Sequence, residues 1–164
     1  DESRGAIALS SSMTGYYAVG DYYAAQDIYM TVRNYTGTPD STISLGLNIT
    51  AMDPTNGAKT RPTATGTAPP VTEEGAWAWA EGWNAWGYYP GTGGNDFYLL
   101  KCTGDPRGNN WVWSKQTFTG TAHPCYNGSA GMPLNRLNFV SSLGAFLWEA
   151  DYNVAAQMIR VAQP

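Results

Sequence analysis

The chain has 164 residues and a net charge of −4, and charged residues make up only 13% of it. This length suits one domain with a substantial core, and low charge with abundant Gly, Thr, Tyr and Trp is typical of β-sheet proteins with hydroxyl- and amide-covered surfaces. The sequence has no cluster of Lys and Arg, which argues against nucleic acid as a partner, and no apolar run long enough to span a bilayer.

The N-terminal residues 1–14 begin with charged side chains and continue as an extended segment in which Ile7 and Leu9 share one face. Because position 1 is not Met, we expect an exported protein whose signal peptide has been removed. We predict that residues 1–14 can serve as an inter-subunit strand and that residues 15–164 form one domain. Two tyrosine pairs six residues apart would face the same side of a continuous strand: Tyr16 with Tyr17, and Tyr22 with Tyr23.

The clearest strand pattern covers residues 27–35, where apolar and polar side chains alternate as in a half-buried antiparallel sheet. The same alternation returns in residues 43–52, and an Asp-Pro-Thr-Asn-Gly turn at residues 53–57 ends that strand. We expect their alternate apolar side chains to face the core: Ile28, Met30, Val32, Ile43, Leu45, Leu47, Ile49 and Ala51.

The run VGDYYAAQDIYMTVRNYTGTPDSTISLGLNITAMDPTNGAK, residues 19–59, resembles the rhythm of strand, polar turn, strand and Asp-x-x-x-Gly turn of immunoglobulin-like domains in extracellular and cell-surface proteins. The resemblance implies an antiparallel β-sandwich and no active residues. The buried Trp and paired cysteines of antibody domains are not at their expected spacing. The predicted fold class is therefore all-β, an antiparallel β-sandwich of immunoglobulin-like or jelly-roll-like type.

Residues 59–74 are rich in Pro and Thr and show no apolar periodicity. We expect an extended surface connection, partly of polyproline II type. A linker between two domains would have a similar composition.

Residues 75–100 form the densest apolar block and hold four of the seven tryptophans. Trp77 and Trp79 would leave one face of a strand while small alanines leave the other. The many Gly and Pro residues between positions 82 and 94 predict an aromatic loop. A second strand is expected at residues 96–102.

The C-terminal third is the part of the chain with the weakest pattern. A strand is expected at residues 111–118, with Trp111 and Trp113 on one face, and residues 119–135 are expected to be irregular. We then predict a hairpin with strands at residues 144–149 and 154–161 and a turn at Asp151-Tyr152-Asn153. A short helix over residues 143–150 is the alternative.

Two cysteines, Cys102 and Cys125, are enough for one intrachain disulfide, and together with the single histidine, His123, they are too few for a structural zinc site. The bridge would close a loop of roughly two dozen residues and contribute about 3 kcal/mol. Two reduced thiols are the alternative. We expect no metal and no cofactor. Three sequons make a glycoprotein conceivable: Asn34, Asn48 and Asn127.

A glycosidase would need two carboxylates facing each other across a cleft. The candidate acids are Glu81, Asp96, Glu149 and Asp151, and no stretch resembles the catalytic strands of jelly-roll xylanases or cellulases. His123 is next to a proline and near Cys125, which is a poor setting for a mobile base. We therefore expect no enzymatic activity. Calcium binding among Asp96, Asp105 and Asp151 is left open.

Carbohydrate binding is one non-enzymatic hypothesis. In the expected aromatic loop, exposed rings could stack on sugar faces: Trp83, Trp86, Tyr88 and Tyr89. Polar neighbours would then accept hydrogen bonds from sugar hydroxyls: Asn84, Asn95 and Asp96. The other tryptophans are expected in the core.

Self-assembly is the leading hypothesis. A sheet edge with few charges can accept a strand from another copy, and a head-to-tail contact of this kind builds a fibre. Ile7 and Leu9 would be the inserted side chains, and the two tyrosine pairs would line the contact. We expect a secreted or cell-surface protein that polymerises into a fibre or coat, as a viral coat protein could do by the same contacts. In the alternative, Ile7 and Leu9 pair within their own subunit.

Overall fold

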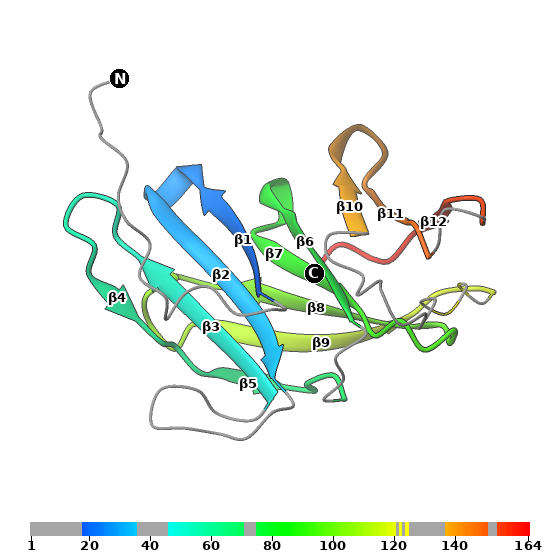
Figure 1. Cartoon of the computed structure of the whole chain (residues 1–164), viewed down its shortest axis with the longest axis horizontal. Coiled ribbons are helices and arrows are strands. Elements are labelled where there is room, and N and C mark those ends of the chain that lie inside the picture. The colour runs from blue at the N-terminus through cyan, green and yellow to red at the C-terminus, as the bar shows by residue number, and fades with distance from the viewer. Residues whose placement is uncertain are drawn as a thin grey trace.

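The computed structural model describes residues 18–35, 46–70, 75–120, 122, 124, 137–150 and 154–164. In this part of the chain, β-strands are joined by turns and three short 3-10 turns, so the all-β prediction is confirmed (Figure 1). The strands are β1 (Ala18–Tyr23), β2 (Ile28–Tyr35), β3 (Gly46–Met52), β4 (Lys59–Thr60), β5 (Ala64–Gly66), β6 (Ala76–Ala80), β7 (Ala85–Tyr89), β8 (Asp96–Cys102), β9 (Trp111–Thr117), β10 (Leu137–Val140), β11 (Ala145–Trp148) and β12 (Gln157–Ile159). The 3-10 turns are η1 (Ala24–Gln26), η2 (Glu81–Trp83) and η3 (Ser141–Leu143).

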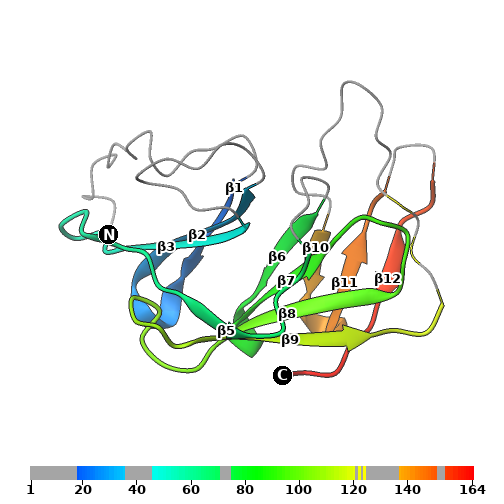
Figure 2. The ribbon, with the colours of Figure 1, turned by 90° about the horizontal axis from the view of Figure 1, so that it is seen from below.

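The described strands form three sheets. Sheet A has the order β1-β2-β3-β4, sheet B the order β5-β9-β8-β7-β6, and sheet C the order β10-β11-β12. Neighbouring strands are antiparallel except β5 and β9, which pair in parallel. Figure 2 shows sheet B between sheet A on one side and sheet C on the other.

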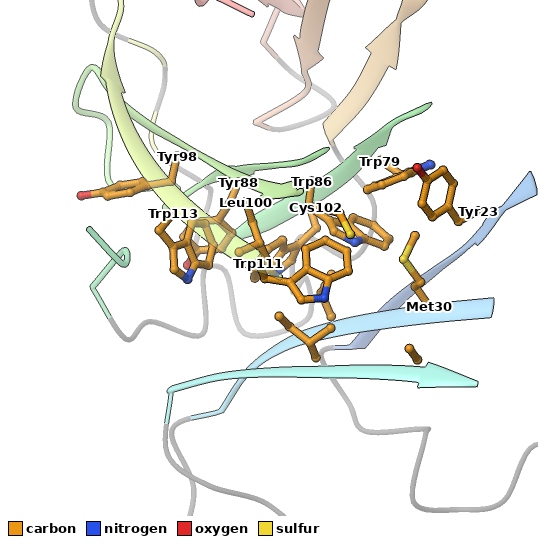
Figure 3. Packing of buried hydrophobic residues seen from close by; sticks show 14 of the residues in the cluster. Tyr23, Met30, Trp79, Trp86, Tyr88, Tyr98, Leu100, Cys102, Trp111 and Trp113 are labelled. Atoms are coloured by element: carbon orange, nitrogen blue, oxygen red, sulfur yellow. The ribbon is translucent and has the colours of Figure 1, made fainter. Parts of the chain in front are cut away.

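The face of sheet B toward sheet A is built mainly from aromatic rings (Figure 3). Trp77 and Trp79 of β6 lie with ring centroids 6.4 and 5.3 Å from that of Trp86 in β7. Aromatic side chains bury roughly 150–250 Å² each, so these rings dominate the contact between the two sheets. Sheet A completes this core with Tyr23, Ile28, Met30, Val32, Ile49 and Ala51.

The opposite face of sheet B packs on sheet C through a different set of side chains. Phe97 of β8 and Phe146 of β11 have ring centroids 4.7 Å apart. β6 contributes only small side chains to this face, which lets β10 approach closely: Ala76, Ala78 and Ala80. Because both faces are covered, β6 and β7 are buried at every position. A two-layer sandwich, immunoglobulin-like or jelly-roll-like, is not confirmed by this arrangement.

The aromatic loop expected at residues 82–94 is wrong for residues 85–89, which form β7. A strand covered on both faces does not alternate between apolar and polar side chains. In the sequence, Gly87 is therefore interpreted as part of a turn. Gly87 has a packing role instead, since a Cβ there would lie within 2.3 Å of the Phe146 ring.

Several other expected strands are confirmed. β2, β8 and β9 match the patterns at residues 27–35, 96–102 and 111–118, and β3 matches the described part of residues 43–52. β6 confirms the strand expected around Trp77 and Trp79. β11 confirms a strand near residues 144–149, so the helix alternative is wrong. The final strand, β12, is shorter than expected, and β10 was not predicted. The turn expected at residues 151–153 lies outside the described residues.

The connection expected at residues 59–74 takes part in two sheets. β4 pairs with β3 in sheet A, and β5 pairs with β9 in sheet B. Beside these strands, the backbone N–H of Thr63 donates to the Asn109 side chain over 2.8 Å. This segment therefore runs from one sheet to the next with strand pairing in both.

Candidate assembly surface

β1 lies at the edge of sheet A, where it pairs with β2 alone within the described chain. The backbone N–H of Tyr22 donates to Asp21 Oδ1 over 2.7 Å, away from β2. Hydrogen-bonding directions alternate along an antiparallel strand, so the N–H of Gly20 points to the same outer edge. Gly20, Asp21 and Tyr22 are all exposed. The edge thus carries outward backbone groups of the kind an added strand needs.

Only one tyrosine of the pair in β1 lies at the surface. Tyr22 is 45% exposed, and its hydroxyl donates to the Asp27 carboxylate. Tyr23 is 4% exposed and packs edge-on against Trp79, with ring centroids 5.2 Å apart. Burial, and then the nearby Cys102 and Glu81, raises the pKa of Tyr23. The expectation that Tyr23 lines an inter-subunit contact is therefore corrected, because its ring belongs to the core between sheets A and B. The other expected assembly residues lie outside the described residues: Ile7, Leu9, Tyr16 and Tyr17.

Three hairpins of the described chain share one type of connector. β1–β2, β6–β7 and β10–β11 are each joined by a 3-10 turn and one left-handed residue, namely Asp27 (φ 51°), Asn84 (φ 51°) and Gly144 (φ 55°). In each connector, the N–H of this residue donates to the carbonyl of the first turn residue, over 3.3, 3.0 and 3.2 Å. Asp, Asn and Gly are the residue types that adopt this conformation most readily.

Each of these hairpins also places two aromatic side chains directly opposite each other. The cross-strand pairs are Tyr22 with Tyr29, Trp79 with Trp86, and Phe139 with Phe146. In all three, the aromatic residues are seven positions apart and the left-handed residue stands two positions before the second one. This spacing is visible in the sequence, but sequence reasoning missed it because each strand was considered separately.

The three connectors lie along one edge of the molecule, at the top of Figure 1. The Trp83 ring of η2 has its centroid 4.9 Å from that of Phe139 and 5.7 Å from that of Phe146, which joins the second hairpin to the third. β6 also neighbours β1, which joins the second hairpin to the first. Rigid strands thus present three neighbouring turns, an arrangement that proteins often use for binding.

Three of the residues expected to stack on a glycan belong to the core. Trp86, Tyr88 and Tyr89 are 0% exposed, so their ring faces cannot form a surface platform. The Tyr89 hydroxyl donates to the Gly94 carbonyl over 3.1 Å, and burial raises the pKa of Tyr89 to about 12. The expected platform is therefore corrected, because β7 is covered on both faces.

The remaining glycan candidates are not brought together. Trp83 is half-buried, and the Asn84 carbonyl accepts a hydrogen bond from the N–H of Cys102 at the end of β8. Asp96 begins β8 at its other end and forms an ion pair with Lys115 at 2.8 Å, which raises the pKa of Lys115. Asn95 lies beside Asp96, where its carbonyl accepts from the N–H of Phe118 over 3.0 Å.

The acidic residues considered for catalysis or calcium are also separated. Glu81 lies next to the Asn84 connector, at the opposite end of β8 from Asp96, and Glu149 follows β11. Asp105 pairs with Arg107 at 2.9 Å, and the hydrogen bond from Arg107 lowers the pKa of Asp105. No group of three or more His, Cys, Asp or Glu that could hold a metal ion occurs among the described residues. Asp151 lies outside them.

Cys102 is a buried free thiol whose Sγ donates to the Gly104 carbonyl over 3.2 Å. Burial raises the pKa of this thiol, with Asp105 adding to the effect and the Gly104 hydrogen bond opposing it. Cys125 and His123 lie outside the described residues, so the expected bridge between the cysteines is not confirmed. Of the sequons, Asn34 lies on β2 and Asn48 on β3, while Asn127 lies outside the described residues.

Comparison of the chain with protein-family models, curated proteins and solved structures found no match in any of the three. Among the described residues, no helix is long and apolar enough to cross a membrane. The geometry of the chain itself therefore carries the functional argument.

Proposed function

We propose that this protein is a non-enzymatic structural subunit that assembles with copies of itself by β-strand addition, in a secreted fibre or coat. In this proposal, residues 1–14 of one copy add to the outer edge of β1 in the next, and Ile7 and Leu9 are the inserted side chains. The single observation that supports the proposal most strongly is the position of β1 at the edge of sheet A, where Gly20, Asp21 and Tyr22 are exposed.

The polar groups at the outer edge of β1 favour pairing with a specific strand over pairing with any exposed strand. The Asp21 carboxylate accepts the Tyr22 N–H, so an incoming strand must displace a charged acceptor before it can pair there. Charged residues on edge strands discourage unspecific pairing. Gly20 has no side chain of its own, and the Tyr29 ring of β2 occupies the space where a Cβ would lie. A cognate strand can therefore pair where a random strand is disfavoured.

Head-to-tail addition also fits the position of the donor segment in the chain. The segment directly precedes β1, so each copy would give one strand and receive one at the same corner of the fold. A heterologous contact of this kind propagates into a fibre when its rotation does not close into a ring. Main-chain hydrogen bonds would supply affinity, and the alternate side chains of the donor would supply specificity.

Light scattering and electron microscopy of the full chain test this proposal. We expect high-mass species that are lost when Ile7 and Leu9 are both replaced by Asp, because charged side chains cannot enter an apolar contact. The matched control is replacement of Ser10 and Ser12 by Asp, which adds the same charge to the same segment and should preserve assembly. Equal loss of assembly in both variants, or a monodisperse monomer for the full chain, would contradict strand addition.

The carbohydrate alternative has weaker support. Trp83 and Asn84 are the only two of its seven expected residues that share the edge of the three connectors, and the Trp83 ring is already packed against sheet C. A monomer whose tryptophan fluorescence shifts on addition of polysaccharide would favour it over assembly.

A further inference from the structure

Sheet C has one covered face and one outer face. Its covered face contributes Leu137, Phe146, Trp148 and Ile159 to the core shared with sheet B. Side chains alternate along strands, so the intervening residues face outward. Asn138, Leu147 and Met158 form one row across this outer face, because Asn138 pairs with Leu147 and Leu147 pairs with Met158. Met158, at the β12 end of the row, is 48% exposed, and Leu147, at its centre, is half-buried. The row therefore has an accessible apolar part that is most open at β12.

Opposite charges flank this row on its two sides. Glu149 follows Leu147 by two positions in the direction of β11, and Arg160 follows Met158 by two positions in the direction of β12. β11 and β12 are antiparallel, so the two charges lie on opposite sides of the row, each about 7 Å from it. Both side chains are exposed. The outer face is therefore apolar in the middle, acidic at one end and basic at the other.

We propose that this outer face of sheet C is a homodimer contact between two copies of the chain, related by a two-fold axis along the row of Asn138, Leu147 and Met158. This axis lays the row of one copy on the row of the other and reverses the strand direction. Glu149 of each copy then faces Arg160 of its partner. Packed sheets are about 10 Å apart, a gap that an extended Glu and Arg can bridge together.

The charge pattern selects this geometry over its main competitor. A two-fold axis parallel to the strands would place Glu149 over the same residue of the second copy, and like charges in contact oppose association. The chosen axis brings two pairs of opposite charges together and is self-complementary, as an isologous contact requires. Complementary charge thus identifies a second copy as the occupant.

Size predicts that the contact is weak alone. Three short strands present less area than the roughly 1,200–2,000 Å² of stable protein interfaces. We therefore expect a dimer that dissociates on dilution and that is reinforced when copies are already linked by another contact. The dimer does not depend on strand addition, and it would connect neighbouring fibres or close a coat.

Sedimentation velocity over a concentration series tests the dimer, using the full chain with Ile7→Asp and Leu9→Asp so that strand addition does not interfere. We expect Glu149→Arg and Arg160→Glu each to raise the dimer Kd about tenfold or more, because each creates like-charge contacts. Combining both substitutions exchanges the charges and should restore the Kd to within about threefold of the parent. Met158→Lys should also abolish the dimer by placing a charge in the exposed apolar part of the row.

Val112→Lys is the matched control, since Val112 is also an exposed apolar strand residue, 39% exposed, on sheet B. It should leave the dimer Kd unchanged. A monomer at every concentration, single charge reversals without effect, or failure of the combined exchange to restore the dimer would overturn the proposal. When Glu149→Arg or Arg160→Glu is made in the chain that keeps Ile7 and Leu9, any high-mass species that persist result from strand addition. The dimer and strand addition can therefore be refuted independently of each other.

Discussion

At the scale of single residues, Gly87 shows how a missing side chain positions two sheets. It lies in the middle of β7, where a Cβ would come within 2.3 Å of the Phe146 ring and 2.9 Å of the Phe97 ring. The absence of a side chain at this point lets the Phe146 ring of sheet C rest directly on sheet B. In the sequence, the same glycine favoured a turn, since glycine is common in turns and nothing in the neighbouring letters reveals a ring from residue 146.

Gly87→Ala should destabilise the fold by about 1–3 kcal/mol, the usual cost of forcing extra volume into a packed core. Urea unfolding measures the change. Gly82→Ala is the control, since no atom lies within 4 Å of the Cβ it would add, and it should change stability by less than about 0.5 kcal/mol. Equal stability of the two variants would show that sheets B and C do not meet closely at β7.

Cys102 gives a second prediction for a single residue. Its thiol should react with a thiol-specific reagent in the denatured chain without prior reduction, and very slowly in the native chain, because burial raises its pKa and limits access. A raised pKa in the folded state means that this thiol contributes stability below its ordinary pKa and that the contribution is lost as the pH rises above it. Absence of reaction in denaturant until a reductant is added would instead establish the bridge to Cys125.

At the scale of elements, the repeated hairpin is the unit from which the three sheets are built. One example lies in each sheet, and each combines a left-handed residue with an aromatic pair across the strands. Period-two alternation predicted β2, β3 and β9 because those strands carry a readable pattern. It failed for β7, and it missed β10, because the first is apolar on both faces and the second is only four residues long.

The left-handed position predicts a difference between two substitutions in equivalent connectors. Gly144→Ala should cost about 1 kcal/mol, because a Cβ is strained at φ 55° even though the nearest atom outside the connector, Trp83 Cζ2, is 3.9 Å away. Asn84→Gly should be tolerated within about 0.5 kcal/mol, since glycine adopts this conformation readily. Thermal unfolding of both variants tests the shared geometry, and a stable Gly144→Ala protein would contradict it.

At the scale of the whole molecule, sheet B is covered on both sides. Its face toward sheet A carries large aromatic rings, and its face toward sheet C carries the alanines of β6 and the Phe97 ring, which packs on Phe146 of sheet C. Composition predicted an all-β chain, because low charge and many β-branched and aromatic residues suit sheets. It could not predict the number of layers. That depends on which face of β6 meets which neighbour, and the alternation of Trp and Ala along β6 is compatible with either a solvent-facing or a sheet-facing alanine side.

The same limit applies to the candidate surfaces. The glycan set failed because burial of Trp86, Tyr88 and Tyr89 is a property of the assembled sheets and not of the local sequence. The outer edge of β1 depends on strand order, and the charge pattern on sheet C depends on the register between β11 and β12. Pairings between separate segments decide all three features, and no local pattern in the sequence encodes them.

Amide hydrogen exchange at Gly20 tests strand addition most directly, since the N–H of this residue points to the outer edge of β1. In the full chain at concentrations where high-mass species form, exchange at Gly20 should slow by at least about tenfold relative to the variant with Asp at positions 7 and 9, because a new main-chain hydrogen bond protects it. High-mass species in which Gly20 exchanges as fast as in that variant would show that the chain assembles by some other surface.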